Sequence, residues 1–98
     1  MITSKQRSYL KKLGHNLKPI TQIGKEGVSE KFVKQLDLML ESHELVKITV
    51  HDNNMLNVKE TANTLCETLK AEFVQAIGRK ITIYRKAKED PTIELPRK

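Results

Sequence analysis

Apolar side chains recur along the chain at two different spacings, and each spacing predicts a type of element. Three stretches repeat apolar residues every three or four positions, as amphipathic helices do: residues 4–13, 30–42 and 58–73. Residues 46–51 alternate strictly between apolar and polar side chains, which predicts a strand with one buried face. Short apolar runs bounded by glycine, proline or charged residues predict the remaining strands: residues 19–23, 73–77 and 81–84. The order helix, strand, helix, strand, helix, strand, strand predicts one small α/β (α+β-like) domain with a mixed sheet and packed helices.

Capping residues mark where each predicted helix begins. Thr3 and Gln6 have the spacing of a capping box, and Asn57 and Glu60 repeat that spacing before the third helix. Ser29 is a good N-cap for the second helix. These signals place the helix starts near residues 4, 30 and 58.

Glycines and turn residues mark where elements end. Gly14 suits the position just past the first helix, and residues 52–54 form a turn. Residues 78–80 read as a three-residue hairpin connection in which Gly78 takes a positive φ. Leu38 falls outside the apolar stripe of its helix, so we expect it to be partly buried against a neighbour or to contact a partner. Two prolines among charges predict an extended tail, and we divide the chain into a domain at 1–86 and a tail at 87–98.

The length, the single cysteine and the lack of a long apolar run exclude several classes of protein. Ninety-eight residues cannot enclose a two-domain enzyme cleft, and nothing resembles a membrane span or a secretory signal. One cysteine, Cys66, cannot form an internal disulfide, which agrees with a reducing compartment. The three histidines lack metal-ligand spacing, and no nucleophile, carboxylate-pair or nucleotide-binding signature is present. We therefore expect a cytoplasmic protein with no catalytic site, cofactor, metal, small-molecule substrate or membrane partner.

The net charge of +6 is distributed unevenly along the chain. Residues 1–34 carry eight basic and two acidic side chains, residues 35–78 three and seven, and residues 79–98 seven and three. If the fold brings the basic ends together, one face would attract a polyanion such as RNA or DNA. The alternative is an ordinary solvated surface.

The local feature that points to chemistry is Gly24-Lys25-Glu26-Gly27, between a predicted strand and a helix N-terminus. Two glycines let backbone approach a phosphate closely, the following helix offers unpaired N–H groups, and Lys25 supplies a cation. Glu26 would repel a phosphate, so we expect it to turn aside or to contact another group. The alternative for such a tetrapeptide is an ordinary turn.

Basic residues near this loop predict a continuous phosphate track that joins it to the first helix. Beyond the loop residues Gly24, Lys25, Glu26 and Gly27, the candidate RNA-binding residues are Lys31, Lys34, Lys5, Arg7, Lys11, Lys12, Lys18, Lys47 and Arg85. Lys47 and Arg85 are second-tier candidates, and for them solubilising charge is the alternative. Phe32 and Phe73 lie on apolar helix stripes and are expected in the core, so a platform of stacking aromatics is absent.

Several separated motifs, in order, resemble the CRM (chloroplast RNA splicing and ribosome maturation) domain family, in particular its bacterial stand-alone YhbY-type members. The matching segments run nearly end to end: residues 10–13, 15–19, 23–29, 43–48, 75–78, 84–85 and 95–96. The resemblance implies an RNA-binding domain with a four-stranded mixed sheet, a GxxG loop similar to that of KH domains, and association with precursors of the large ribosomal subunit.

The sequence thus predicts a non-enzymatic RNA-binding protein that clamps the RNA backbone with its GxxG loop. The resemblance to the family implies that this RNA is precursor 23S ribosomal RNA, held during large-subunit assembly. One alternative is an interaction module that binds a ribosomal protein or assembly factor through the acidic middle region and Leu38. A second alternative is a small RNA-processing enzyme with a histidine as general base.

Overall fold

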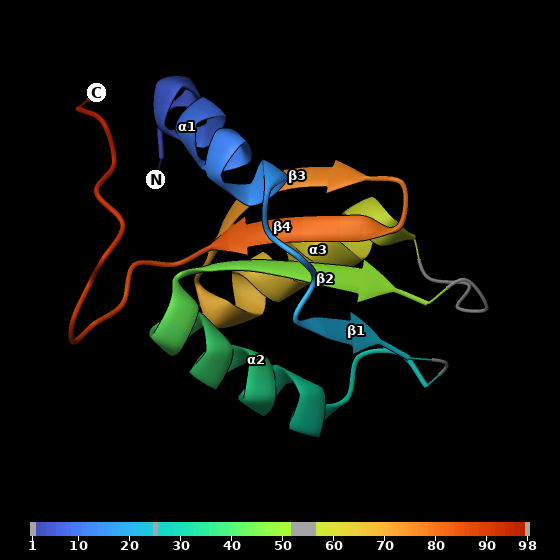
Figure 1. Cartoon of the computed structure of the whole chain (residues 1–98). Coiled ribbons are helices and arrows are strands. Elements are labelled where there is room, and N and C mark those ends of the chain that lie inside the picture. Colours follow the sequence, from blue (N-terminus) through green and yellow to red (C-terminus); the bar gives the residue numbers. More distant parts are fainter. Residues whose placement is uncertain (1, 25, 52–56, 98) are drawn as a thin grey trace.

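A mixed sheet with helices on both of its faces makes up the fold. A computed structural model of the chain describes residues 2–24, 26–51 and 57–97. In these residues the elements are α1 (Ser4–His15), β1 (Thr21–Ile23), α2 (Glu30–His43), β2 (Leu45–Val50), α3 (Val58–Leu69), β3 (Glu72–Ile77) and β4 (Lys80–Tyr84). The strand order is β1-β2-β4-β3, with β1 parallel to β2 and the other two pairs antiparallel (Figure 1). The predicted order of elements and the mixed sheet are confirmed.

The alternation of side chains along β2 divides the core between the two faces of the sheet. Val46, Ile48 and Val50 belong to the larger cluster, which α2 and α3 complete from one side. Leu45 points the other way and packs with Leu10 of α1 in a smaller cluster. The predicted buried face of this strand is therefore confirmed, and α1 lies on the face opposite to α2 and α3 (Figure 1).

The helix starts follow the predicted capping residues. Thr3 and Gln6 form a complete capping box at α1. Ser29 Oγ accepts from the N–H of Phe32 at 3.0 Å, and Asn57 Oδ1 accepts from the N–H of Glu60 at 3.0 Å. Each side chain satisfies one of the N–H groups that a helix leaves without an internal partner.

Gly14 lies inside α1, so the prediction that it follows the end of the helix is wrong. The helix continues to His15, and Gly14 is buried against the sheet. A Cβ atom at this position would lie 3.2 Å from Cγ2 of Thr82 on β4. The glycine therefore permits close packing of helix on strand, and the left-handed cap that its sequence context suggested is not formed.

The apolar stripe of the third helix ends before Phe73, which lies on β3, so its placement on a helix stripe is wrong. Lys70 takes a left-handed conformation at φ 56°, and the N–H groups of Lys70 and Ala71 both donate to Cys66 O. This cap ends α3 and lets the chain turn into the sheet. Phe73 is nonetheless partly buried against the larger cluster, as a core residue would be.

The hairpin between β3 and β4 is one residue shorter than predicted. Only Gly78 and Arg79 separate the strands, since Lys80 pairs with Ile77 and already belongs to β4. Gly78 has the expected positive φ, 57°. The predicted turn at 52–54 lies outside the described residues.

The tail after β4 contains no helix or strand in its described part, 85–97, as expected, but it is held against the body of the domain. Ile93 and Leu95 pack on the smaller cluster. The side chain of Gln6 donates to Pro96 O at 3.0 Å, so the two ends of the chain lie side by side (Figure 1). The division at 86/87 stays a prediction, because packing of this kind does not by itself define a domain boundary.

Candidate nucleic-acid interface

The residues that follow β1 form a tight turn at the edge of the sheet. The N–H of Gly27 donates to Gly24 O at 3.0 Å, and Gly27 takes φ 81°, where a side chain would strain the backbone. Among the described residues, no atom outside the chain neighbours of Gly24 lies within 4 Å of the position that its Cβ would take. This position leaves space for a ligand beside the Gly24 Cα. Lys25, the predicted cation of this loop, lies outside the described residues.

The turn leads within two residues into the N-terminus of α2. Ser29 caps the helix, and Lys31 and Lys34 lie exposed in its first turns. A helix N-terminus carries partial positive charge and N–H groups that favour an anion. The structure therefore brings together four features that suit a phosphate group: an open glycine turn, a helix N-terminus and two exposed lysines.

Glu26 is exposed and lines a groove that runs from the loop along α3. Gly27 and Val28 line the same groove from the loop, and Thr64 lines it from α3. The expectation that Glu26 turns aside from a phosphate or contacts another group stays a prediction.

The basic residues of α1 lie on the other face of the sheet. Lys5, Lys11 and Lys12 are exposed there, whereas Arg7 is half-buried and its Nε donates to Phe73 O at 2.9 Å. α1 packs over β2, β4 and β3, and α2 packs on the opposite face. The sheet therefore separates these lysines from Lys31 and Lys34, and one continuous track on a single face is not what the structure shows.

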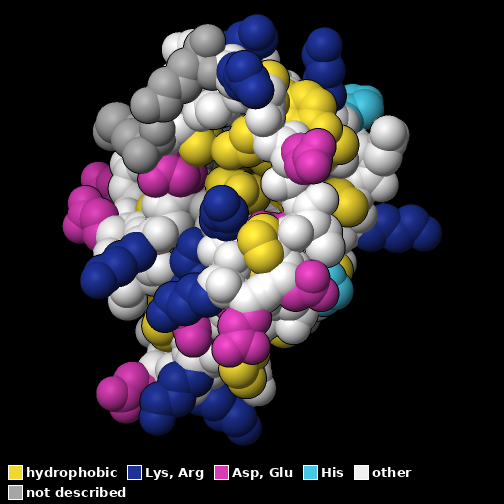
Figure 2. Space-filling view, turned by 90° about the vertical axis from the view of Figure 1, so that its left-hand side faces the viewer, with side chains coloured by type: hydrophobic (Ala, Val, Ile, Leu, Met, Phe, Trp, Pro, Cys, Tyr) yellow, Lys and Arg dark blue, Asp and Glu magenta, His cyan; other side chains and the backbone are white. Residues whose placement is uncertain are grey.

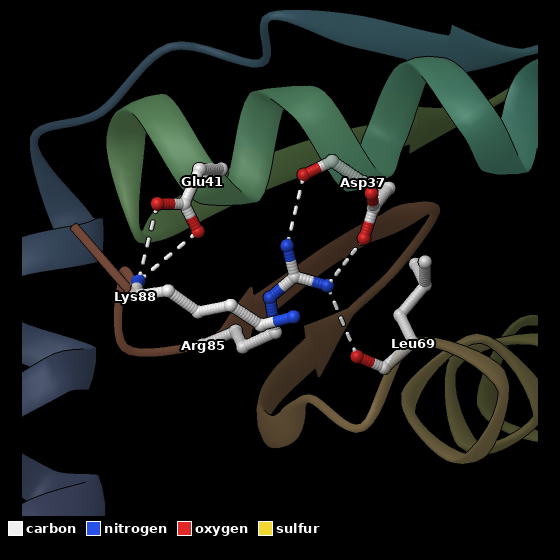
Figure 3. Close-up of polar contacts among 5 residues, drawn as sticks. All are labelled: Asp37, Glu41, Leu69, Arg85 and Lys88. Atoms are coloured by element: carbon white, nitrogen blue, oxygen red, sulfur yellow. Dashed lines mark hydrogen bonds and ion pairs between the residues drawn. The ribbon is translucent and has the colours of Figure 1, made fainter.

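The remaining candidates are dispersed. Lys18 is exposed in the connection between α1 and β1, and Lys47 is half-buried on the α1 side of β2. Arg85 is occupied inside the fold (Figure 3): its Nη1 donates to Asp37 Oδ1 at 2.6 Å and to Leu69 O at 3.1 Å, and its Nη2 donates to Asp37 O at 2.9 Å. This guanidinium joins the middle of α2 to the end of α3.

The side of the molecule that carries the two chain ends does not form a single basic patch. Figure 2 shows Lys and Arg side chains interspersed with Asp and Glu on this side. The N–H groups of Lys88 and Glu89 donate to the Glu41 carboxylate, which brings an acidic residue of the middle segment beside the basic tail. The two ends of the chain do lie together, but Glu41 of α2 lies there as well and binds the tail.

Two polar residues with structural importance were not singled out by the sequence. Glu44 is 1% exposed, and its carboxylate accepts a hydrogen bond from the N–H of Ala87 in the tail. Arg79 donates to Val50 O and His51 O at the end of β2. Neither has a local signal, because both bind groups that are distant in sequence. A third feature that the sequence analysis missed does have a local signal. Thr61, Thr64 and Thr68 recur at helical spacing along one side of α3.

Within the described ranges, no group of His, Cys, Asp and Glu side chains is arranged to hold a metal ion. In the same part of the chain, no helix combines the length and the apolar character that crossing a bilayer requires.

Comparison with known proteins identifies relatives over the whole chain. The family model of the CRS1 / YhbY (CRM) domain matches residues 2–85. The chain is 38% identical over 96 residues to the probable RNA-binding protein YqeI of Bacillus subtilis, which covers 98% of this chain and 100% of that protein. It is 33% identical over 97 residues to an RNA-binding protein of Haemophilus influenzae, with 99% and 97% of the two chains covered.

A solved structure has the same fold. The solution structure of the hypothetical protein SAV1595 from Staphylococcus aureus, a candidate RNA-binding protein, is 51% identical to this chain and superposes with a TM-score of 0.83. The match covers 98% of this chain and all of the other.

Proposed function

Because the chain belongs to the CRS1/YhbY (CRM) domain family, we propose that it is a non-enzymatic RNA-binding protein that holds RNA backbone at the Gly24–Gly27 loop. The observation that carries this proposal is the turn closed by Gly27 N–H and Gly24 O, directly before the capped N-terminus of α2. Backbone N–H groups and the exposed Lys31 and Lys34 would contact successive phosphates. The RNA-binding relatives support the same ligand class.

The other basic candidates have different parts in this proposal. Lys25 belongs to the loop itself. The exposed lysines of α1, together with Lys18 and Lys47, would form a second contact region on the opposite face of the sheet. These lysines of α1 are Lys5, Lys11 and Lys12. Arg7 and Arg85 are left out, because their guanidinium groups already donate to Phe73 O, Leu69 O and Asp37.

Replacing Lys31 and Lys34 together with alanine tests the backbone clamp. Each phosphate contact to a single strand contributes about 0.7 to the slope of log affinity against log salt, so the slope should fall by about 1.4. Titration of a fluorescent single-stranded RNA at several salt concentrations measures both the affinity and the slope. K86A/K88A is the matched control, since it removes two exposed lysines from the tail. Equal affinity and slope in all three proteins would refute the clamp.

We extend the proposal to the ligand: precursor 23S ribosomal RNA in assembling large-subunit particles, in the cytoplasm. Crosslinking in cells followed by identification of the bound RNA tests this step. Enrichment of precursor 23S RNA over mature RNA is expected, and enrichment of unrelated RNAs would contradict it. Incubation of the pure protein with the same precursor should leave the RNA uncleaved, and cleavage would support the enzyme alternative instead.

Leu38 favours a second candidate function, contact with a ribosomal protein or assembly factor. Its side chain is 68% exposed in a shallow hollow beside Asp37, Glu41 and Arg85. L38D tests this without disturbing the two carboxylates, which hold Arg85 and the tail. Loss of sedimentation with ribosomal particles, with unchanged affinity for naked RNA, would support a protein partner at this site.

A further inference from the structure

A groove of about 490 Å³ lies between the glycine loop, the first turns of α2 and one side of α3. Val28, Val33 and Leu65 provide its apolar surface. Thr61, Thr64 and Thr68 provide hydroxyl groups along α3. The groove is continuous with the proposed phosphate clamp, because Glu26 and Gly27 belong to both.

The charge of the groove differs from that of the loop beside it. Its charged lining residues, among those that the structure describes, are Glu26 and Glu60, and both are acidic. A phosphate would be repelled here, whereas a flat, neutral group with N–H donors would meet an apolar surface and carboxylate acceptors. In RNA, that description fits the base and excludes the backbone.

We propose that this groove binds one unstacked RNA base with an exocyclic amino group, next to the backbone held by the glycine loop. The proposal rests on the proposed function, which brings a single strand to the loop. Single-stranded RNA is commonly recognised by bases that leave the stack and form hydrogen bonds along their edges. Val28 and Val33 would contact the faces of the base, and Glu60 would accept from its amino group.

This arrangement predicts a base preference. Cytosine and adenine each present an amino group, and a carboxylate is a good acceptor for it. Uracil has no amino group, and its single N–H lies between two carbonyl oxygens, so a carboxylate that accepted from this N–H would also meet the flanking carbonyl oxygens. We expect ten-residue oligonucleotides of C or A to bind about tenfold more tightly than the U oligonucleotide, the scale of one good edge contact.

Two variants test the groove. E60Q removes the charged acceptor at constant size, and T64F fills the groove from an exposed position on α3. Both should bring the affinity ratio of the C and U oligonucleotides close to one, while the salt slope stays at the wild-type value. E67Q and N63F are the matched controls, because Glu67 and Asn63 are exposed on α3 and do not line the groove.

The outcomes separate this proposal from the proposed function. K31A/K34A should weaken binding of all three oligonucleotides equally and flatten the salt slope, so the clamp and the groove have different signatures. Wild-type protein that binds RNA without base preference, or groove variants that keep the wild-type ratio, would overturn the base site and leave the clamp standing. Binding of a lysine-rich peptide that T64F abolishes, without any change in RNA ratios, would assign the groove to a protein partner. Wild-type protein that binds no RNA at all would overturn both.

Discussion

Glu44 has a strained, positive-φ backbone, and its carboxylate accepts four hydrogen bonds from the tail. It ends α2 with φ 64°, and its side chain is buried. Oε2 accepts from Ala87 N–H at 2.9 Å, and Oε1 accepts from Thr92 N–H at 2.7 Å, Thr92 Oγ1 at 2.9 Å and Ile93 N–H at 2.9 Å. A buried carboxylate is tolerable because these donors replace water. One residue therefore ends a helix and fixes the tail.

The pKa of Glu44 makes stability depend on pH. Burial alone would raise this pKa. The hydrogen bonds from Ala87, Thr92 and Ile93 lower it by more than burial raises it, so the pKa lies below the ordinary 4.5. A carboxyl whose pKa is lower in the folded state stabilises the protein above its unfolded pKa, and this contribution is lost as pH falls through the folded pKa. Stability should therefore decline as pH falls below about 4.5.

E44Q isolates this contribution. The amide keeps one acceptor but directs an NH₂ group at backbone donors, so we expect a loss of about 2–4 kcal/mol at pH 7. Urea unfolding at pH 7, 5, 4 and 3 measures the free energy of unfolding of both proteins. The two curves should converge toward low pH, and parallel curves would contradict the role of the carboxylate. Residual pH dependence in E44Q is expected from Glu41, whose pKa is also lowered, chiefly by the Lys88 and Glu89 N–H groups.

At the scale of elements, Gly14 shows how the sheet overrides helix propensity. Alanine is intrinsically about 1 kcal/mol better than glycine inside a helix. The Cβ that alanine would add, however, meets the methyl group of Thr82 at 3.2 Å, and Thr82 is buried on β4. The packing of α1 on the sheet therefore opposes what the helix alone would prefer.

A double-mutant cycle measures this conflict. The change that G14A makes in the free energy of unfolding should be less favourable in the wild-type background than in T82S, because T82S removes the obstructing methyl group. We expect a coupling free energy of about 1 kcal/mol from urea unfolding of the four proteins. S8A, at an exposed position of α1, is the control. Its effect on the free energy of unfolding should simply add to that of T82S. Additive effects of G14A and T82S would show that the contact does not limit the helix position.

The elements that the sequence predicts well are those whose signals are local. The caps at Ser29 and Asn57 and the alternation of β2 depend on neighbouring residues, and all are confirmed. Gly14 was misplaced because a contact with the distant Thr82 decides its role. Phe73 lies past the left-handed cap at Lys70, in the strand that the run 73–77 predicts and not on the helix stripe. The same division holds for the candidate site: the glycine loop is a local pattern, whereas the groove needs α2 and α3 side by side.

At the scale of the molecule, the sheet decides which charges can act together. Net charge alone suggested a basic face formed by the two chain ends. The ends do lie together, but Glu41 of α2 meets the tail there, while Lys31 and Lys34 lie at the other end of the same helix. The proposed interface is therefore at the loop edge of the sheet, away from the ends.

Removal of the tail tests its part in the fold. A chain of residues 1–86 keeps the helices and strands described above. It loses the donors of the Glu44 carboxylate described above and the packing of Ile93 and Leu95. A loss of about 3 kcal/mol is expected, which lowers Tm by roughly 12–24 °C in a protein of this size. The control, residues 1–96, retains these contacts and should melt like the full chain. Equal Tm values for the two truncated chains would show that the tail is not part of the folding unit.

The carboxylate of Glu44 closes a long loop of chain. Its donors at Ala87, Thr92 and Ile93 lie 43, 48 and 49 residues further along the sequence. The helix caps at Ser29 and Asn57, by contrast, join residues only three positions apart. Contacts between distant residues must overcome the entropy of closing the loop before they stabilise the fold. We therefore expect the tail contacts of Glu44 to raise the contact order of the domain and to slow its folding.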